Sequence, residues 1–131
     1  MIITLSGSTR FESEFIIAQR ELSRRGINFF SLAVLPQHRL PDENWTDGSY
    51  DKVIADLLYF DRILNSDAVV VLGDGYIGQS TAREILWAHI QQKPIIRHLI
   101  KDDWNTTADL IRQGESFDNK GLLIQAQEVF R

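Results

Sequence analysis

The residues best suited to chemistry gather around two glycine-containing turns. The longer turn runs from Gly73 to Gly78, and Ser80 and Glu84 follow it closely. The shorter turn is Gly7-Ser8-Thr9-Arg10. Glycine lets a backbone approach a ligand closely, hydroxyls and arginine can bind phosphate, and a glutamate can act as a nucleophile or base. If the turns meet in space, they could hold a small phosphorylated ligand beside a reactive carboxylate.

The longer turn lies between a predicted strand at 67–72 and a predicted helix at 81–92. A strand, a glycine-rich turn and a helix start together place N–H groups and a positive dipole end where an anion could bind. In that interpretation Ser80 contacts a phosphate and Glu84 lies in the cleft. The alternative is a capping box from Thr81 to Glu84, in which the carboxylate only bonds back to the helix start. On the local pattern alone, the capping box is the more frequent outcome.

The shorter turn has a similar ambiguity. It follows a predicted strand at 2–6, and its hydroxyls and Arg10 could hold a phosphate or a ribose. Alternatively, Thr9 and Glu12 form a capping box, and Gly7 is present only for the tight turn. The turn lacks the Gly-Lys-Ser/Thr ending of a Walker loop, and it is not the dinucleotide-binding fingerprint.

Strands and helices are expected to alternate along the whole chain. The predicted strands are 2–6, 27–34, 67–72 and 95–99, and the predicted helices begin near 11, 53, 81, 107 and 122. A long loop is expected at 35–50. Such alternation predicts an α/β domain with three layers, a parallel sheet with helices on both faces. Both glycine-containing turns follow strands, so they should lie at the carboxyl edge of the sheet, where such folds bind ligands.

The composition narrows the possible partners. A chain of 131 residues with 44% hydrophobic residues is expected to form one soluble domain, residues 1–131. No apolar run approaches the roughly 20 residues needed to cross a membrane. A net charge of −4 argues against a nucleic-acid polymer, although small phosphorylated ligands stay possible. With no cysteine and three scattered histidines, we expect no metal site and a cytoplasmic setting.

Three stretches together resemble the nucleoside 2-deoxyribosyltransferase-like superfamily, in particular its small phage-associated and bacterial members. These stretches are residues 3–11, residues 66–71, and the most specific one, residues 75–85, completed by Ala88 and Lys93-Pro94-Ile95. The resemblance covers about residues 2–98. It implies a flavodoxin-like or Rossmann-like fold and cleavage of the N-glycosidic bond of a (deoxy)nucleoside or its 5′-monophosphate, by hydrolysis or transfer and without a cofactor. It also implies a homodimer or larger homo-oligomer.

The same resemblance gives roles to individual residues. Glu84 matches the nucleophilic glutamate of the family, and Ser80 matches the serine that binds the 5′-phosphate. The full predicted substrate-binding set is Gly7, Ser8, Arg10, Gly75, Tyr76, Gly78 and Ser80. The family's sugar-binding aspartate falls in register on Tyr59, and we expect Asp61, or alternatively Asp56, to replace it. A second hypothesis is a non-catalytic nucleotide-binding or sensing protein on the same fold.

Overall fold

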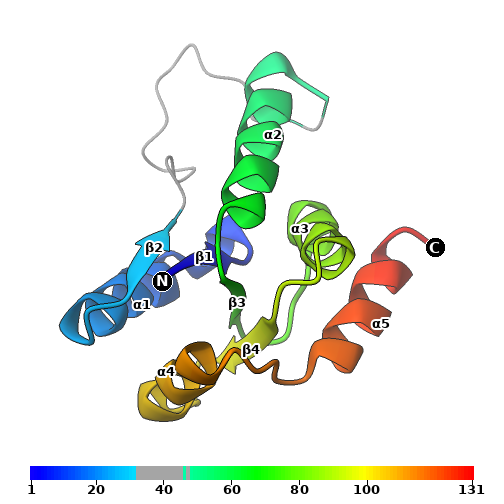
Figure 1. Cartoon of the computed structure of the whole chain (residues 1–131). Helices are drawn as coiled ribbons and strands as arrows, with labels where there is room; N and C mark the ends of the chain where they lie inside the picture. The colour runs from blue at the N-terminus through cyan, green and yellow to red at the C-terminus, as the bar shows by residue number, and fades with distance from the viewer. Residues whose placement is uncertain (32–45, 47) are drawn as a thin grey trace.

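The computed structural model describes residues 1–31, 46 and 48–131, in which strands and helices alternate (Figure 1). The strands are β1 (Ile2–Ser6), β2 (Asn28–Phe30), β3 (Ala68–Gly73) and β4 (Ile95–Leu99). The helices are α1 (Glu12–Arg24), α2 (Tyr50–Leu64), α3 (Gln79–Ile90), α4 (Trp104–Gln113) and α5 (Asn119–Val129), with a short 3₁₀ helix, η1 (Thr9–Phe11), before α1. The predicted order of elements is confirmed, with bounds that differ by a few residues. Most of the predicted loop at 35–50, and positions 32–34 of the second predicted strand, lie outside the described residues.

The four strands form a parallel sheet in the order β2-β1-β3-β4. This is the start of the flavodoxin-like order 2-1-3-4-5, in which the direction of winding reverses between β1 and β3. Where a fifth strand would follow, Phe117 makes an isolated parallel bridge to Ile96 beside β4. The reversal point matters because loops leaving β1 and β3 at their carboxyl ends turn to opposite faces and leave a crevice between them.

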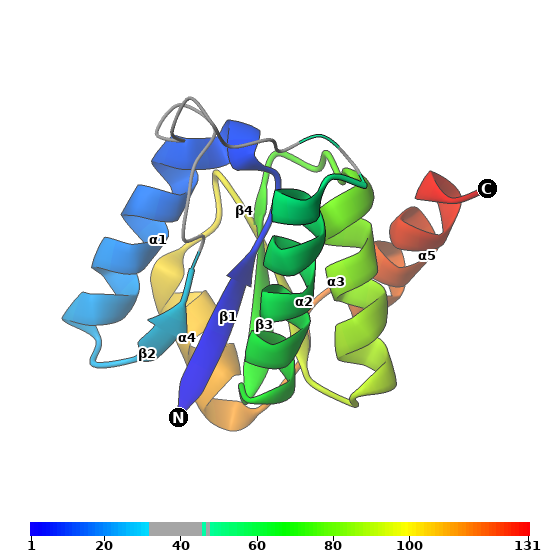
Figure 2. The same ribbon diagram turned by 90° about the horizontal axis from the view of Figure 1, so that it is seen from above.

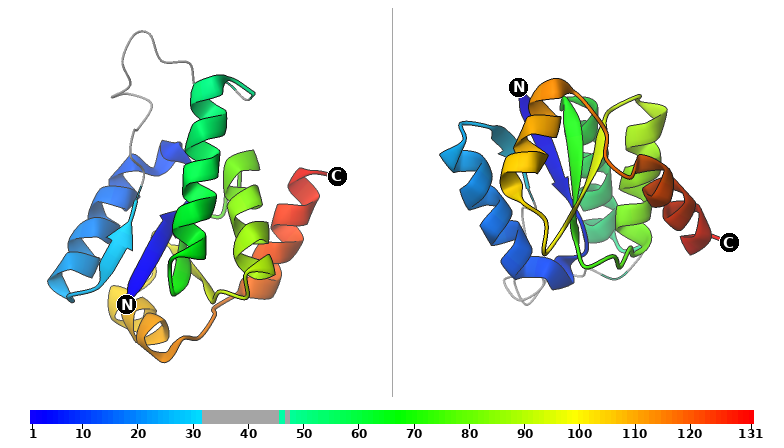
Figure 3. Two further views of the ribbon diagram at one scale, coloured as in Figure 1. Left: turned by 45° about the horizontal axis from the view of Figure 1, so that its top comes forward. Right: turned by 90° about the horizontal axis from the view of Figure 1, so that it is seen from below.

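Helices cover both faces of the sheet, so the predicted three-layer architecture is confirmed (Figures 2 and 3). Helices α1 and α4 pack on one face, and α2, α3 and α5 pack on the other. Every residue of β3 is buried, as expected for a Val-rich central strand that is covered on both sides. No helix in the described part of the chain is long and apolar enough to cross a membrane.

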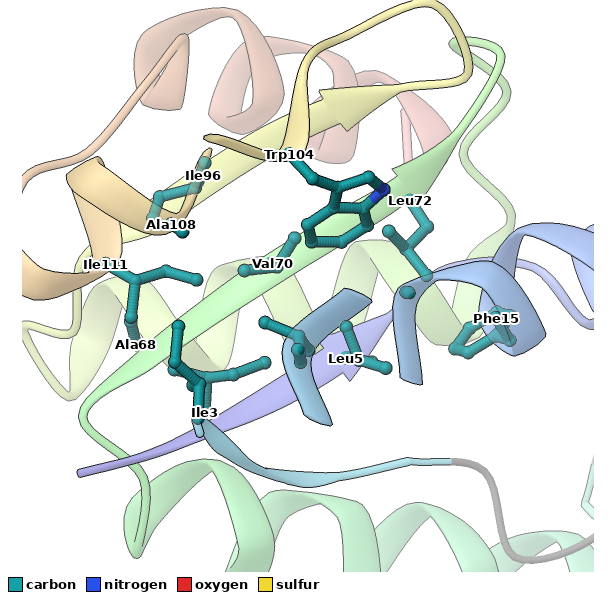
Figure 4. Packing of buried hydrophobic residues seen from close by; sticks show 13 residues of the cluster. Ile3, Leu5, Phe15, Ala68, Val70, Leu72, Ile96, Trp104, Ala108 and Ile111 are labelled. Carbon is teal, nitrogen blue, oxygen red and sulfur yellow. The ribbon is translucent and has the colours of Figure 1, made fainter. Parts of the chain in front are cut away.

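Alternation along β1 sends different chemistry to the two faces. Ile3 and Leu5 are fully buried against α1 and α4, in a cluster that also contains Val70 and Trp104 (Figure 4). Thr4 and Ser6 are equally buried but point to the opposite face, where both find polar partners. The first strand therefore contributes apolar side chains to one layer and hydroxyls to the other.

Candidate active site

Both glycine-containing turns lie at the carboxyl edge of the sheet, as predicted, and their backbones leave no room for side chains. Gly7 has φ +150°, and a Cβ there would lie 2.9 Å from the Leu72 carbonyl oxygen. Gly73 has φ +134°, and a Cβ would lie 2.6 Å from the Phe11 ring. Both positions therefore require glycine for backbone conformation and for space. The two turns can approach each other at the reversal point only because of this.

A cavity of about 240 Å³ opens beside these turns, between α2 and the N-terminal half of α3. It is lined by Gly7, Ser8, Thr9, Lys52, Ala55, Asp56, Leu58, Tyr59, Arg62, Gly78, Gln79, Ser80, Thr81 and Glu84. The lining residues come from three segments that are far apart in the sequence. Hydroxyls, charged groups and an apolar wall therefore surround one space.

Glu84 is the buried acid of this cavity, with 7% of its surface exposed. Its Oε1 accepts a hydrogen bond of 2.5 Å from the Ser6 hydroxyl at the end of β1. Among the described residues, no hydrogen-bond donor is found for the other carboxylate oxygen, Oε2. Burial is the main cause that raises the pKa of the Glu84 carboxyl to about 8. The Ser6 hydrogen bond and the Lys52 charge act to lower this pKa, whereas the Asp56 charge acts to raise it.

The capping-box alternative for Glu84 is wrong. Helix α3 begins at Gln79 with Gly78 as its N-cap, two residues earlier than predicted, so Thr81 already lies inside the first turn. Glu84 is consequently in the second turn, beyond reach of the helix start, and its carboxylate contacts β1 instead. Helix capping therefore does not explain why this carboxylate is buried on the wall of the cavity.

The capping-box alternative for the first turn is also wrong. Ser8 is the N-cap of η1, and its hydroxyl accepts a 3.3 Å hydrogen bond from the Arg10 amide. Helix α1 follows with Phe11 as its N-cap, and Phe11 makes no side-chain capping bond. Thr9 is therefore not a cap, and its side chain lies beside the cavity.

The aspartate predictions on α2 separate clearly in the structure. Asp56 lines the cavity together with Tyr59, which lies three residues further along the helix. Asp61 is exposed and does not line the cavity, and its backbone and side chain accept hydrogen bonds from Asn65. Asp61 follows Tyr59 by two residues, which in a helix of 3.6 residues per turn points it to roughly the opposite side.

Tyr59 occupies the register at which the resembled family has its aspartate. It is 6% exposed, and its hydroxyl donates a 2.7 Å hydrogen bond to the Leu5 carbonyl oxygen. Burial, with the nearby Glu84 charge adding to it, raises the pKa of the Tyr59 hydroxyl well above its usual range. Tyr59 is therefore a neutral wall of the cavity.

Lys52, like Ser6, is a residue of the site that the sequence analysis missed. Its ammonium donates a 2.5 Å hydrogen bond to Asp56 Oδ1 and another to the Ser80 hydroxyl. Arg83 lies 4.0 Å from the other oxygen of Asp56. The i,i+4 spacing of Lys52 and Asp56 is a pattern that could have pointed to this pair.

The remaining predicted residues are Arg10, Gly75 and Tyr76, of which Arg10 and Tyr76 form a bridge between the two turns. The Arg10 guanidinium lies over the Tyr76 ring, 3.7 Å from its centroid, and neither residue lines the cavity. Gly75 does not line it either, and its carbonyl oxygen accepts a hydrogen bond from Gln125. The structure thus brings Gly7, Ser8, Gly78, Ser80 and Glu84 of the predicted set together and leaves Arg10, Gly75 and Tyr76 outside.

No group of three or more histidine, aspartate or glutamate side chains among the described residues is arranged to hold a metal ion. The acidic groups that line the cavity, Asp56 and Glu84, lie there with the cations Lys52 and Arg62. The polar groups that line the cavity include carboxylates, an ammonium group, a guanidinium group and several hydroxyls.

Comparisons with known proteins find likeness in structure. No protein-family model matches the sequence, and no curated protein matches it. A 2-deoxyribosyltransferase from Bacillus psychrosaccharolyticus superposes with a TM-score of 0.63 at 20% identity, over 93% of this chain and 96% of that chain. A CMP N-glycosidase from Clostridium botulinum superposes with a TM-score of 0.53 at 14% identity, over 97% of this chain and 99% of that chain. A conserved protein from Enterococcus faecalis gives 0.50 at 18% identity, over 98% of both chains.

These identities are too low to carry an activity across, but the shared fold spans nearly the whole chain. The two enzymes among them are of the kind that the sequence motifs resemble, so the resemblance is confirmed at the level of the fold.

Proposed function

We propose that this protein cleaves the N-glycosidic bond of a (deoxy)nucleoside or its 5′-monophosphate, with Glu84 as the nucleophile. The observation that carries the proposal is the Glu84 carboxylate itself, buried, held by Ser6 and placed on the wall of a cavity at the reversal point of the sheet. The likeness of fold to a deoxyribosyltransferase and to a CMP N-glycosidase supports chemistry at this type of bond.

The reaction follows the logic of retaining glycosidases. The ionised Glu84 carboxylate forms a bond to C1′ of the sugar while the base departs with the bonding electron pair, through an oxocarbenium-like transition state. The resulting glycosyl-enzyme ester is then attacked at C1′ by water, for hydrolysis, or by a second base, for transfer. The hydrogen bond from Ser6 to Oε1 orients the carboxylate so that its other oxygen can face the sugar.

The contact to the sugar hydroxyls is assigned to Asp56 in preference to Asp61. Asp56 lines the same cavity as Glu84, whereas Asp61 is exposed to solvent. Asp56 also carries a fixed partner in Lys52, which keeps its side chain at the cavity.

The test is release of free base from nucleosides and nucleoside 5′-monophosphates, followed by chromatography. Glu84→Gln should lower base release by about 10³-fold or more while ligand binding persists. Glu128→Gln, an exposed glutamate of α5, is the matched control and should behave as the unmutated protein. Adding a second base separates transfer, which yields a new nucleoside, from hydrolysis. No base release from any of these compounds by the unmutated protein would sink the proposal.

The raised pKa of Glu84 favours the second hypothesis, a nucleotide-binding or sensing protein. With a pKa of about 8, the Glu84 carboxyl is mainly protonated at pH 7, and a protonated acid is not a nucleophile. In that case a nucleotide binds, Glu84→Gln binds it equally well, and neither protein releases base. The same experiment therefore distinguishes the two functions.

We further propose that a second copy of the chain packs on the outer face of α2. Its apolar side chains are between 43% and 80% exposed: Tyr50, Val53, Ile54, Leu57, Leu58 and Leu64. Leu58 also lines the cavity, so this face adjoins the site. Light scattering should report a dimer or larger assembly for the unmutated chain and a monomer for Leu57→Glu; a monomeric unmutated chain contradicts the proposal.

A further inference from the structure

The cavity has two chemically different ends. Glu84, buried and acidic, lies at one end, in the second turn of α3. Lys52 and Ser80 lie at the other, where the first turn of α3 approaches the first turn of α2. The mechanism proposed above uses Glu84 and Asp56, and it gives Lys52 no contact with the substrate.

Two donors at the Lys52 end have no acceptor among the described residues, a third ammonium proton and the Ser80 hydroxyl proton. An ammonium group has three protons, and among the described residues two of them are accepted, by Asp56 and by Ser80. Because the Ser80 oxygen accepts from Lys52, the hydroxyl keeps its own proton to donate. No acceptor for that proton is found in the described ranges 1–31, 46 and 48–131. The lysine and the serine both line the cavity, so two free donors border one space.

Such a pair of donors suits a ligand group made of acceptors. A phosphate offers several oxygens and a negative charge, and hydrogen bonds between charged groups are about twice as strong as those between neutral groups. A sugar hydroxyl or a base edge offers no comparable charge. The ammonium is also held at the cavity: Asp56, one turn along α2, accepts its proton at 2.5 Å, and both side chains are about one-fifth exposed. Lys52 is thus a positioned cation instead of a freely moving surface lysine.

The spacing along α3 fits a single ligand that reaches both ends. Ser80 and Glu84 are four residues apart on one helix, so they lie on the same side and about 6 Å apart along its axis. In a nucleoside 5′-monophosphate, the phosphate and the reacting C1′ lie at opposite ends of one ribose unit. A phosphate at Ser80 therefore places the sugar beside Glu84.

We propose that Lys52 is a specificity-determining residue that, with Ser80, selects a nucleoside 5′-monophosphate over the free nucleoside. This inference rests on the proposed function, because it names the substrate class of the same site. Asp56 has a positioning role in it, since it holds the ammonium toward Ser80.

The test compares kcat/KM for each of the four common deoxynucleoside 5′-monophosphates with that for its deoxynucleoside. The unmutated protein should prefer the monophosphate, and Lys52→Met should lower this preference by about 10- to 100-fold. Lys52→Arg keeps the charge and should retain most of it. The matched control is Lys101→Met, which removes an exposed lysine outside the cavity and should leave the preference unchanged.

The ratio of the two substrates is the informative readout. Losing the Lys52 charge also acts on the ionisation of Glu84, but that effect is common to both substrates and cancels in the ratio. An equal loss for nucleoside and monophosphate, or an unchanged ratio, would overturn the role of Lys52. Circular dichroism checks that Lys52→Met folds, and Lys52→Gln replaces it if it does not.

A binding measurement separates the failure of this inference from the failure of the proposed function. Calorimetry on Glu84→Gln, with and without Lys52→Met, measures affinity for the monophosphates and nucleosides without turnover. Tighter binding of the monophosphate that disappears with Lys52→Met supports the inference even if the unmutated protein releases no base. Base release with a monophosphate affinity indifferent to Lys52 supports the proposed function and rejects the inference.

Discussion

On one face of β1, Ile3 and Leu5 pack into a closed apolar layer; on the other face, Thr4 and Ser6 reach polar partners, and Ser6 holds the acid of a cavity. The four side chains are equally buried. The difference lies in what the covering helices bring. Helices α1 and α4 bring mainly apolar residues, whereas α3 brings Glu84 to a wall that stays open.

Buried polar residues occur on both faces, and they differ in the same way. On the α4 face, the His98 ring stacks on Trp104, with centroids 3.9 Å apart, and Nδ1 contacts the Thr107 hydroxyl at 2.7 Å. His98 is 4% exposed, and burial lowers the pKa of its imidazole. A buried titratable group enclosed by its partners stabilises a fold; one that borders a cavity can also react.

The largest expected effect tests the closed face. Leu5→Ala should lower the free energy of unfolding by about 2–5 kcal/mol, because it leaves a cavity in a packed layer. Base release by the folded fraction should persist, since the Leu5 carbonyl that binds Tyr59 is unchanged. Urea denaturation measures the first quantity. A loss below about 1 kcal/mol would mean that the two faces do not differ as described.

The second prediction concerns the pH dependence of the open face. The pKa of Glu84 is about 8 and its ionised form is the proposed nucleophile, so kcat/KM should rise about tenfold per pH unit below 8 and then level off. The free energy of unfolding should instead decrease as the pH rises. The pKa in the folded protein exceeds the ordinary value of 4.5, so the contribution of Glu84 is fully present below pH 4.5 and is lost as the pH rises through 8.

Thermal unfolding of Glu84→Gln checks this sign. The unmutated protein should lose stability between pH 4.5 and 8, and the variant should not. The melting temperature of the variant should therefore rise relative to that of the unmutated protein as the pH increases. An unmutated protein whose kcat/KM is flat from pH 5 to 8 contradicts the assignment of Glu84 as the titrating nucleophile.

A smaller change is expected from Ser6→Ala. Without the Ser6 hydroxyl, the Glu84 carboxylate loses its hydrogen bond, so its pKa should rise further and the pH profile of kcat/KM should move to higher pH. At pH 7, base release should fall by about 10- to 100-fold. Thr4→Val removes the neighbouring hydroxyl on the same face and should leave the profile in place. A shift of similar size in both variants would indicate a general packing effect.

The smallest effect belongs to the enclosed pair on the α4 face. Thr107→Val should cost about 1 kcal/mol of stability and leave kcat/KM unchanged, because one hydrogen bond is lost far from the cavity. In the unmutated protein, the lowered pKa of His98 means that its contribution is present above pH 6.5 and is lost as the pH falls below that value. Loss of base release in Thr107→Val would connect the two faces and break the comparison.

Much of the fold could be predicted from the sequence because it depends on local patterns. The buried Val-rich run of β3, the helical spacing in α1 and the glycines of both turns each determine a backbone conformation within a few residues. The alternation of strands and helices then implies a parallel sheet, and the turns at strand ends imply a site at its carboxyl edge. These patterns place Gly7, Ser8, Gly78, Ser80 and Glu84 near that edge, and all five line the cavity.

The tertiary structure alone decided what those residues do. Glu84 and Ser6 are 78 positions apart, and Lys52 and Ser80 are 28 apart, so no local pattern could distinguish a helix cap from a buried acid or reveal the lysine. The choice of Asp56 over Asp61 depended on which side of α2 faces the cavity. The sequence by itself determined the two glycine turns and the edge of the sheet at which they lie, because backbone conformation is local. Packing across the sheet decided which side chains share the cavity, because that depends on strand order and helix orientation.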